Sequence, residues 1–225
     1  MIPLLDDHAM SSRIDAIAGG ITTALFFAVG NAIWALDMPE DGTRVAMILR
    51  FYDETADRIV VGGSLSLLSI GVLVFFAASL RQVLIEEGGN EGLATTAFGG
   101  ALLCATAGIA AEGINLVAAL RAQDGELTGE LAHSLFEISQ ISGSAAAGLG
   151  FGVFTLAVGA TTFRGGATFS RPFAGVLLAG GLALISPLAH VNWLAGAGLV
   201  LISVAIAASL ILRSADAQPA GEQAG

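Results

Sequence analysis

Two glutamates, Glu112 and Glu137, stand inside long apolar stretches of the sequence, on either side of a short polar turn. A carboxyl group is costly to expose to hydrocarbon, so both side chains are expected to face the interior of the protein. The two stretches would form antiparallel helices, and each glutamate lies about two helical turns from the connecting turn. Both carboxyl groups should therefore lie roughly 10 Å inside the same boundary of the bundle.

Further polar residues follow the same two helical faces. At a period of about 3.6 residues, each face combines its glutamate with amide or imidazole side chains. A histidine later in the chain is expected on the same side of the bundle. We therefore predict one polar cluster in the outer half of the bundle. Its predicted members are Glu112, Asn115, His133, Glu137, Gln140 and His190.

Three kinds of chemistry fit this predicted cluster. It could be structural, with hydrogen-bonded carboxyl groups of which one or both are protonated, because burial disfavours the ionised form and two close carboxyls do not readily both ionise. It could bind a small polar or cationic ligand or exchange protons, since paired carboxyls with a nearby histidine suit proton transfer. It could instead hold a divalent metal, because mixed histidine and carboxylate ligands suit zinc. The candidate metal ligands are His133, Glu137, Glu112 and His190.

Catalytic motifs do not appear in the sequence. It has no Ser-His-Asp order, nucleophile elbow, phosphate-binding loop or paired cysteines, and it indicates no particular cofactor. The leading hypothesis is therefore a membrane protein that binds a small ligand, ion or protons, a class that includes transporters. The alternative is an accessory or structural subunit that binds other membrane proteins. An intramembrane metal-dependent enzyme ranks third.

The composition predicts an integral membrane protein. Hydrophobic residues make up 55% of the chain and charged residues 12%, about half the charged share of a soluble domain. The natural surroundings are thus a lipid bilayer. The net charge of −10, with every basic residue an arginine, excludes the basic stripe that nucleic-acid binding requires. The arginine-, alanine- and glycine-rich composition fits a bacterial source, and hence the bacterial inner membrane.

The apolar stretches predict an all-α, polytopic bundle of six transmembrane helices in one domain, residues 1–213, followed by a disordered tail at 214–225. A spanning helix needs about 20 apolar residues. A short outer helix is also expected between the first two spans, because one apolar stripe recurs there at helical spacing, formed by Val45, Ile48, Leu49 and Tyr52. It would lie on the membrane interface or fold over the mouth of the bundle. The predicted spans are about 14–36, 59–80, 93–120, 131–163, 172–189 and 193–212.

An even number of spans places both termini on one side of the membrane. The short arginine-bearing loop between the fourth and fifth spans favours a cytoplasmic location for that side. Trp34, Tyr52 and Trp193 would then mark the opposite boundary, where amphipathic rings settle. Small residues on the fourth span predict close helix packing within the chain, with a homo-oligomer or a membrane-protein partner as the alternative.

Two stretches of the sequence resemble a known group of proteins. One is AVGATTFRGG followed by SRPFAGVLLAGGLALISPLAHVNWLAGAGLVLISVAIAASLILR, and the other is RFYDETADRIVVGG. They resemble uncharacterised small integral membrane proteins of actinobacteria and their relatives, classed as domains of unknown function. The resemblance implies a six-helix inner-membrane protein and assigns a function to no residue.

Overall fold

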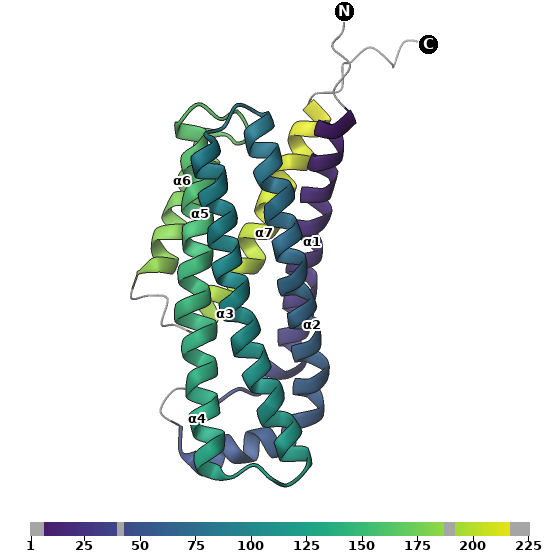
Figure 1. Cartoon of the computed structure of the whole chain (residues 1–225), viewed down its shortest axis with the longest axis vertical. Helices are drawn as coiled ribbons and strands as arrows, with labels where there is room; N and C mark the ends of the chain where they lie inside the picture. The colour runs from purple at the N-terminus through teal and green to yellow at the C-terminus, as the bar shows by residue number, and fades with distance from the viewer. Residues whose placement is uncertain (1–6, 40–42, 187–191, 217–225) are drawn as a thin grey trace, which may run out of the picture.

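The computed structural model describes residues 7–39, 43–186 and 192–216, and these residues form an all-α bundle without strands (Figure 1). Three long helical rods run the height of the bundle, namely the second helix (Val45–Glu86), the third helix (Glu91–Gln123) and a third rod made of α4, η2 and α5. Shorter helices pack against their upper part. The third rod is continuous from Gly129 to Phe163, with a π-helical segment, η2, in its middle. The elements are α1 (Asp7–Trp34), η1 (Ala35–Asp37), α2 (Val45–Glu86), α3 (Glu91–Gln123), α4 (Gly129–Gln140), η2 (Ile141–Ala146), α5 (Ala147–Phe163), α6 (Arg171–Ile185) and α7 (Asn192–Asp216).

Local sequence signals start and stop these helices. Asn90 accepts a hydrogen bond from the Leu93 amide at 3.0 Å and caps α3, and Thr128 and Ser170 cap α4 and α6 in the same way. Gly125 follows α3 with φ 70°, a left-handed conformation that suits glycine at a helix end. The turns between antiparallel helices are therefore encoded locally, and the predicted all-α architecture is confirmed.

Five helices in the described part of the chain are long and apolar enough to cross a membrane, with α4, η2 and α5 counted as one. The helix of the fifth predicted span, α6, has 15 residues, about 22 Å of helix against a hydrocarbon core of about 30 Å. Its end at Ile185 lies beside Gly152 of α5, where an added Cβ would come within 2.5 Å of the Ile185 side chain. The described part of α6 therefore covers only the upper part of the third rod. The rest of the span predicted at 172–189 lies mostly outside the described residues.

The predicted outer helix is the beginning of α2. This helix has 42 residues, about 63 Å, which is roughly twice a bilayer core. Its first turns lie across the lower end of the bundle before the helix turns upward (Figure 1). Ile48 and Tyr52 on the predicted apolar stripe are buried, so the stripe folds over the bundle. Thr55 donates to the Phe51 carbonyl at 2.5 Å, a contact that often bends helices.

The aromatic residues expected at the outer boundary are placed differently. Trp34 and Tyr52 are 4% and 0% exposed and belong to one apolar core at the lower end of the bundle. Both rings are therefore packed inside the protein, Trp34 against Phe51 of α2, and do not settle among lipid headgroups as predicted. The position of the membrane boundary itself stays a prediction. The Trp193 side chain lies outside the described residues.

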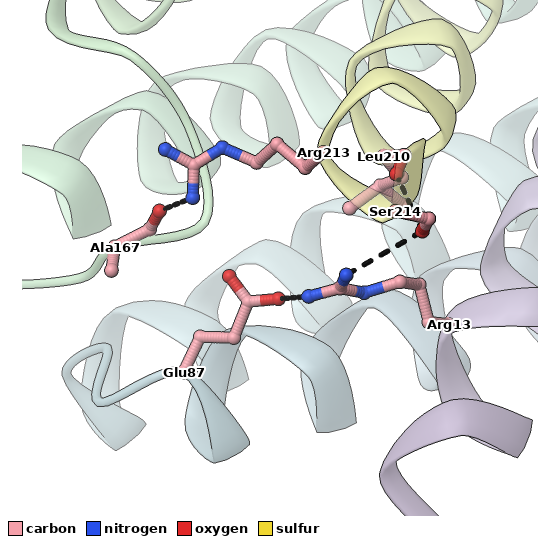
Figure 2. Close-up of polar contacts among 6 residues, drawn as sticks. All are labelled: Arg13, Glu87, Ala167, Leu210, Arg213 and Ser214. Carbon is pink, nitrogen blue, oxygen red and sulfur yellow. Dashed lines mark hydrogen bonds and ion pairs between the residues drawn. The ribbon is translucent and has the colours of Figure 1, made fainter. Parts of the chain in front are cut away.

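A polar network at the upper end joins both ends of the described chain (Figure 2). Arg13 of α1 donates to the Glu87 carboxylate after α2, and to the Ser214 hydroxyl of α7 at 3.5 Å. Arg213 donates to the Ala167 carbonyl in the loop before α6. We call these five residues the terminal clasp. Helix α7 reaches Asp216, into the segment predicted as a tail, and the rest of that tail lies outside the described residues.

Helices approach closely where two glycines face each other. A Cβ on Gly62 would lie 2.5 Å from the Gly30 carbonyl oxygen, and one on Gly30 would lie 2.6 Å from that of Gly62. Gly152 of α5 meets Gly181 of α6 in a similar way. Small residues let membrane helices pack without a hydrophobic driving force, and the predicted close packing of the fourth span within the chain is confirmed.

The lower end of the bundle extends beyond the length that a bilayer requires. A hydrocarbon slab of about 30 Å spans about 20 helical residues. Counted from Arg13 on α1 and from Phe163 on α5, such a slab ends near Ile33 and Gly143. The turns below this level, in α2, α3 and α4, lie outside such a slab, and we call them the outer projection for that reason. Its exposed carboxylates include Asp53, Glu54, Asp57, Asp124, Glu126, Glu130 and Glu137.

Candidate functional site

A cavity of about 740 Å³ lies between α1, α3, α7 and the third rod. This volume is in the range of pockets that hold small organic ligands. The π-helical segment η2 contributes Gly143 and Ser144 to its wall, and Met38 of the segment after η1 reaches its lower end. Gln140 donates to the Met38 sulfur at 3.2 Å, which links that segment to α4.

The polar side chains of the cavity lie toward its lower end, where they share the wall with apolar residues such as Trp34 and Met38, and the part above is apolar. Its apolar part is lined by Ile70, Cys104 and Phe151, among others. Cys104 precedes Glu112 by eight residues on α3, which is about 12 Å along the helix. The polar groups are therefore concentrated near the level where the hydrocarbon slab ends. They are Asn31, Glu112, Asn115, Ser139, Gln140 and Ser144.

Glu112 carries the one carboxyl group among the described residues that line this cavity. It is 7% exposed and lies against α2, where a Cβ on Gly63 would be 3.5 Å from its Oε2. The Ser66 hydroxyl of α2 faces the carboxyl group and also accepts from the Asn31 amide at 3.3 Å. Oε2 of Glu112 is nevertheless buried without a hydrogen-bond partner among the described residues. Leaving such an oxygen unsatisfied costs about 1–3 kcal/mol or more, so this atom requires an explanation.

A second group of hydrogen bonds closes the lower end of the cavity. The Tyr52 hydroxyl donates to Oδ1 of Asn115 at 2.9 Å, and Ser139 of α4 faces the same hydroxyl. Ser139 also donates to the Phe136 carbonyl at 2.8 Å. The Tyr52 hydroxyl thus joins three elements that are distant in sequence. They are the first turns of α2, the second half of α3, and α4.

The structure brings three of the predicted site residues to the cavity: Glu112, Asn115 and Gln140. Glu137 is not among them. Its side chain is 61% exposed and lies 3.2 Å from Nε2 of His133, one turn earlier on the same helix. The prediction that both glutamates face inward is therefore wrong for Glu137. The physical reason is that Glu137 lies in the outer projection, where water can solvate its carboxylate.

The π-helical segment η2 explains why Glu137 does not share the inward face of Ser144. The buried residues of α4 end with Ser139, and the next buried polar residue is Ser144, five positions later. A π-turn joins residues five apart, whereas uninterrupted α-helical periodicity joins residues four apart. The extra residue rotates α4 by about 100° relative to α5. Ser139 therefore occupies the inward face, and His133 and Glu137 lie beside it.

The predicted metal set is not assembled. No group of three or more His, Cys, Asp or Glu side chains that could hold a metal ion exists within 7–39, 43–186 and 192–216. Glu112 faces α2, whereas His133 and Glu137 pair with each other on the outer projection. His190, the remaining candidate for the cluster and for the metal set, lies outside the described residues.

Sequence reasoning missed four residues that shape the site. Tyr52 was expected at the membrane interface, and Ser139 was hidden by the assumption of an unbroken α-helix. Ser66 and Asn31 could have been noticed, because each is a polar residue inside an apolar span. Together with Glu112 they place hydroxyl, amide and carboxyl groups in and beside the polar end of the cavity.

Comparisons with protein-family models, with curated proteins and with solved structures gave no match to this chain. The resemblance to uncharacterised actinobacterial membrane proteins therefore stays a prediction. The case for a function depends on the cavity itself.

Proposed function

We propose that this multi-pass membrane protein binds a small ligand, an ion or protons in the cavity, with Glu112 as the principal binding group. The observation that supports this proposal is the free Oε2 of Glu112, a buried carboxyl oxygen on a side chain that lines a cavity large enough for a ligand. Buried ionisable groups within membrane helices typically serve ligand or ion pathways. Transport is one way in which such a site is used.

The proposed location is a bacterial inner membrane, with both termini in the cytoplasm. Both termini of the described chain lie at the clasp end (Figure 1). The short loop between α5 and α6 lies near them and carries Arg164 and Arg171, a bias typical of cytoplasmic loops. The polar end of the cavity then lies near the outer surface of the membrane, and the outer projection lies beyond it.

Thermal unfolding of the purified protein in detergent tests the proposal. The wild type is compared with Glu112→Gln and with Glu137→Gln, a matched control whose side chain is exposed and does not line the cavity. Each is scanned between about pH 5 and pH 8 and with a panel of inorganic cations, divalent metals and small amines. A ligand that binds only the folded state raises the midpoint of unfolding.

The expected result is a ligand- or pH-dependent midpoint in the wild type and in Glu137→Gln that is lost in Glu112→Gln. Equal behaviour of all three proteins would contradict the proposal. A wild type without any ligand or pH response, together with a stable Glu112→Gln protein, would instead favour the competing role, an accessory subunit, and purification with a membrane partner would then be the next test.

A further inference from the structure

We infer that the ligand of this cavity is an amphiphilic cation, a molecule with an apolar tail and a protonated amine head, which enters from the hydrocarbon of the bilayer. This inference rests on the proposed function and names the ligand class for the same site. The charge of the lining, the distribution of its apolar groups and the position of its opening support it independently.

The charge of the lining selects the head group. Glu112 is the one acidic or basic side chain among the described residues that line the cavity. A buried carboxylate without a counter-ion is strongly unfavourable, and an ammonium group in the cavity would provide both a positive charge and N–H donors for the Glu112 carboxyl group. Asn31, Ser139 and Gln140 offer neutral hydrogen-bonding groups around it. A ligand with a carboxylate head would be repelled by Glu112.

The apolar part of the lining selects the tail. Above Glu112 the cavity is walled by aliphatic and aromatic side chains over about 12 Å of α3, the distance from Glu112 to Cys104. A fully polar ligand would leave this wall uncovered, whereas an apolar tail gains about 25 cal/mol for each Å² that it buries. The wall includes Phe27, Ile70, Phe151, Leu199 and Val200.

The opening of the cavity faces lipid. Ala28 and Ala32 of α1 and Leu201 of α7 line the cavity and are also exposed on the bundle surface, Leu201 by 69%. Both alanines lie above Ile33, within the hydrocarbon slab counted from Arg13. An amphiphile that is already dissolved in the bilayer can therefore reach the cavity from the side, with its head group near the polar boundary.

Quenching of Trp34 fluorescence reports occupancy of the cavity directly. Trp34 lines the cavity and is buried, and Trp193→Phe removes the other tryptophan of the chain. The full-length Trp193→Phe protein is placed in nanodiscs of zwitterionic phospholipid. The three probes are a long-chain amine, an alcohol and a fatty acid of equal chain length, each dibrominated near its head group, because bromine quenches tryptophan on contact and Trp34 lies at the lower end of the bundle. Quenching from the surrounding bilayer rises without saturation, whereas quenching from a site saturates.

The amine is expected to quench saturably at a concentration at least tenfold below that of the alcohol, and the acid is expected not to quench saturably. Glu112→Gln should raise the concentration at which the amine saturates to that of the alcohol. Glu137→Gln should leave the saturation by all three probes unchanged. Ala32→Leu, at the opening, should weaken the saturable quenching by the amine and by the alcohol to the same extent. It tests the site with Glu112 intact if Glu112→Gln does not fold.

Equal saturable quenching by amine and alcohol, unaffected by Glu112→Gln, would overturn the cationic class and the role of Glu112 as the principal binding group, and would leave only ligand binding in the cavity standing. Preference for the acid would do the same. Absence of saturable quenching by all three probes, together with a Glu112-dependent response of the melting midpoint to inorganic cations or pH, would also overturn only the ligand class. Absence of both responses would overturn the inference and the proposed function together.

Discussion

The Tyr52 hydroxyl donates a hydrogen bond to Oδ1 of Asn115 across 2.9 Å, in a setting where both side chains are buried. This bond joins the first turns of α2, which lie across the lower end of the bundle, to the helix that carries Glu112. The polar end of the cavity therefore depends on a segment that composition alone would assign to a surface loop.

Removal of that hydroxyl should destabilise the protein. Tyr52→Phe keeps the ring and leaves Oδ1 of Asn115 buried without its donor, a loss of about 1–3 kcal/mol in the free energy of unfolding. Denaturant titration in detergent measures it. Thr106→Val is the control, because Thr106 is exposed and bonds only to its own helix at the Leu102 carbonyl. Equal stability of Tyr52→Phe and wild type would show that the bond contributes nothing.

The two glutamates of the sequence prediction should behave differently. Glu137→Gln breaks an exposed pair with His133, and such pairs contribute about 0–1 kcal/mol. Glu112→Gln changes a buried group and should alter the unfolding free energy by more than that, with loss of the ligand response. Unfolding of both variants under identical conditions compares them. A larger effect at Glu137 than at Glu112 would refute the placement of the two side chains.

Disulfide formation checks the register of α3 against the third rod. A Cβ on Gly143 would lie 3.4 Å from that of Ala111, close to the separation of about 3.5–4.5 Å that a disulfide requires. In a Cys104→Ala background, Ala111→Cys with Gly143→Cys should therefore oxidise readily. Glu112→Cys with Glu137→Cys should not crosslink with a short reagent. The reverse pattern would mean that the π-turn is absent.

Much of this fold could be predicted from sequence, because apolar stretches of about 20 residues and caps such as Asn90 are local signals. The course of α2 across the lower end could be predicted only in part. Its apolar stripe was visible, but the choice between lying on the interface and folding over the bundle depends on contacts with α3 and α4. Glu112 was identified because a carboxyl group inside an apolar helix is rare. Glu137 was misplaced because one extra residue in η2 rotates everything before it, and no residue type marks a π-turn.

Deletion of Ser142 should expose the role of that extra residue. Removal of one residue from η2 favours a regular α-helix and turns α4 by about 100°. Phe136 and Ser139 would leave the core, and loss of one large buried side chain costs about 1.5–3 kcal/mol. Thermal unfolding should show a clearly lower midpoint. Deletion of Glu126, in the turn before α4, serves as the control and should have a smaller effect. Similar midpoints for the two deletions would contradict this role.

Close approach of α1 and α2 should depend on Gly62. In Gly62→Val, the new Cβ would lie 2.5 Å from the Gly30 carbonyl oxygen, so the helices must separate, at a cost of about 1–3 kcal/mol. Gly71→Val, on the same helix, is the matched control, because no atom lies within 4 Å of a Cβ at that position. Unfolding in detergent and the yield of folded protein measure both. Equal effects of the two substitutions would show that the contact is not required.

Orientation in the membrane can be read with reporters at the two ends of the bundle. The terminal clasp holds α1 and α7 at one end through Arg13 and Ser214 (Figure 2), and Gly125 lies in the turn at the opposite end. A reporter that works only in the cytoplasm should therefore be active when it is fused after Gly225. The same reporter should be inactive when it is inserted after Gly125, and a reporter that works only outside should give the opposite pair of results, because the two points lie across the bilayer. Exchange of the two results would reverse the proposed orientation and place the polar end of the cavity at the cytoplasmic surface. Activity of both fusions in one compartment would contradict the membrane crossing of the long rods.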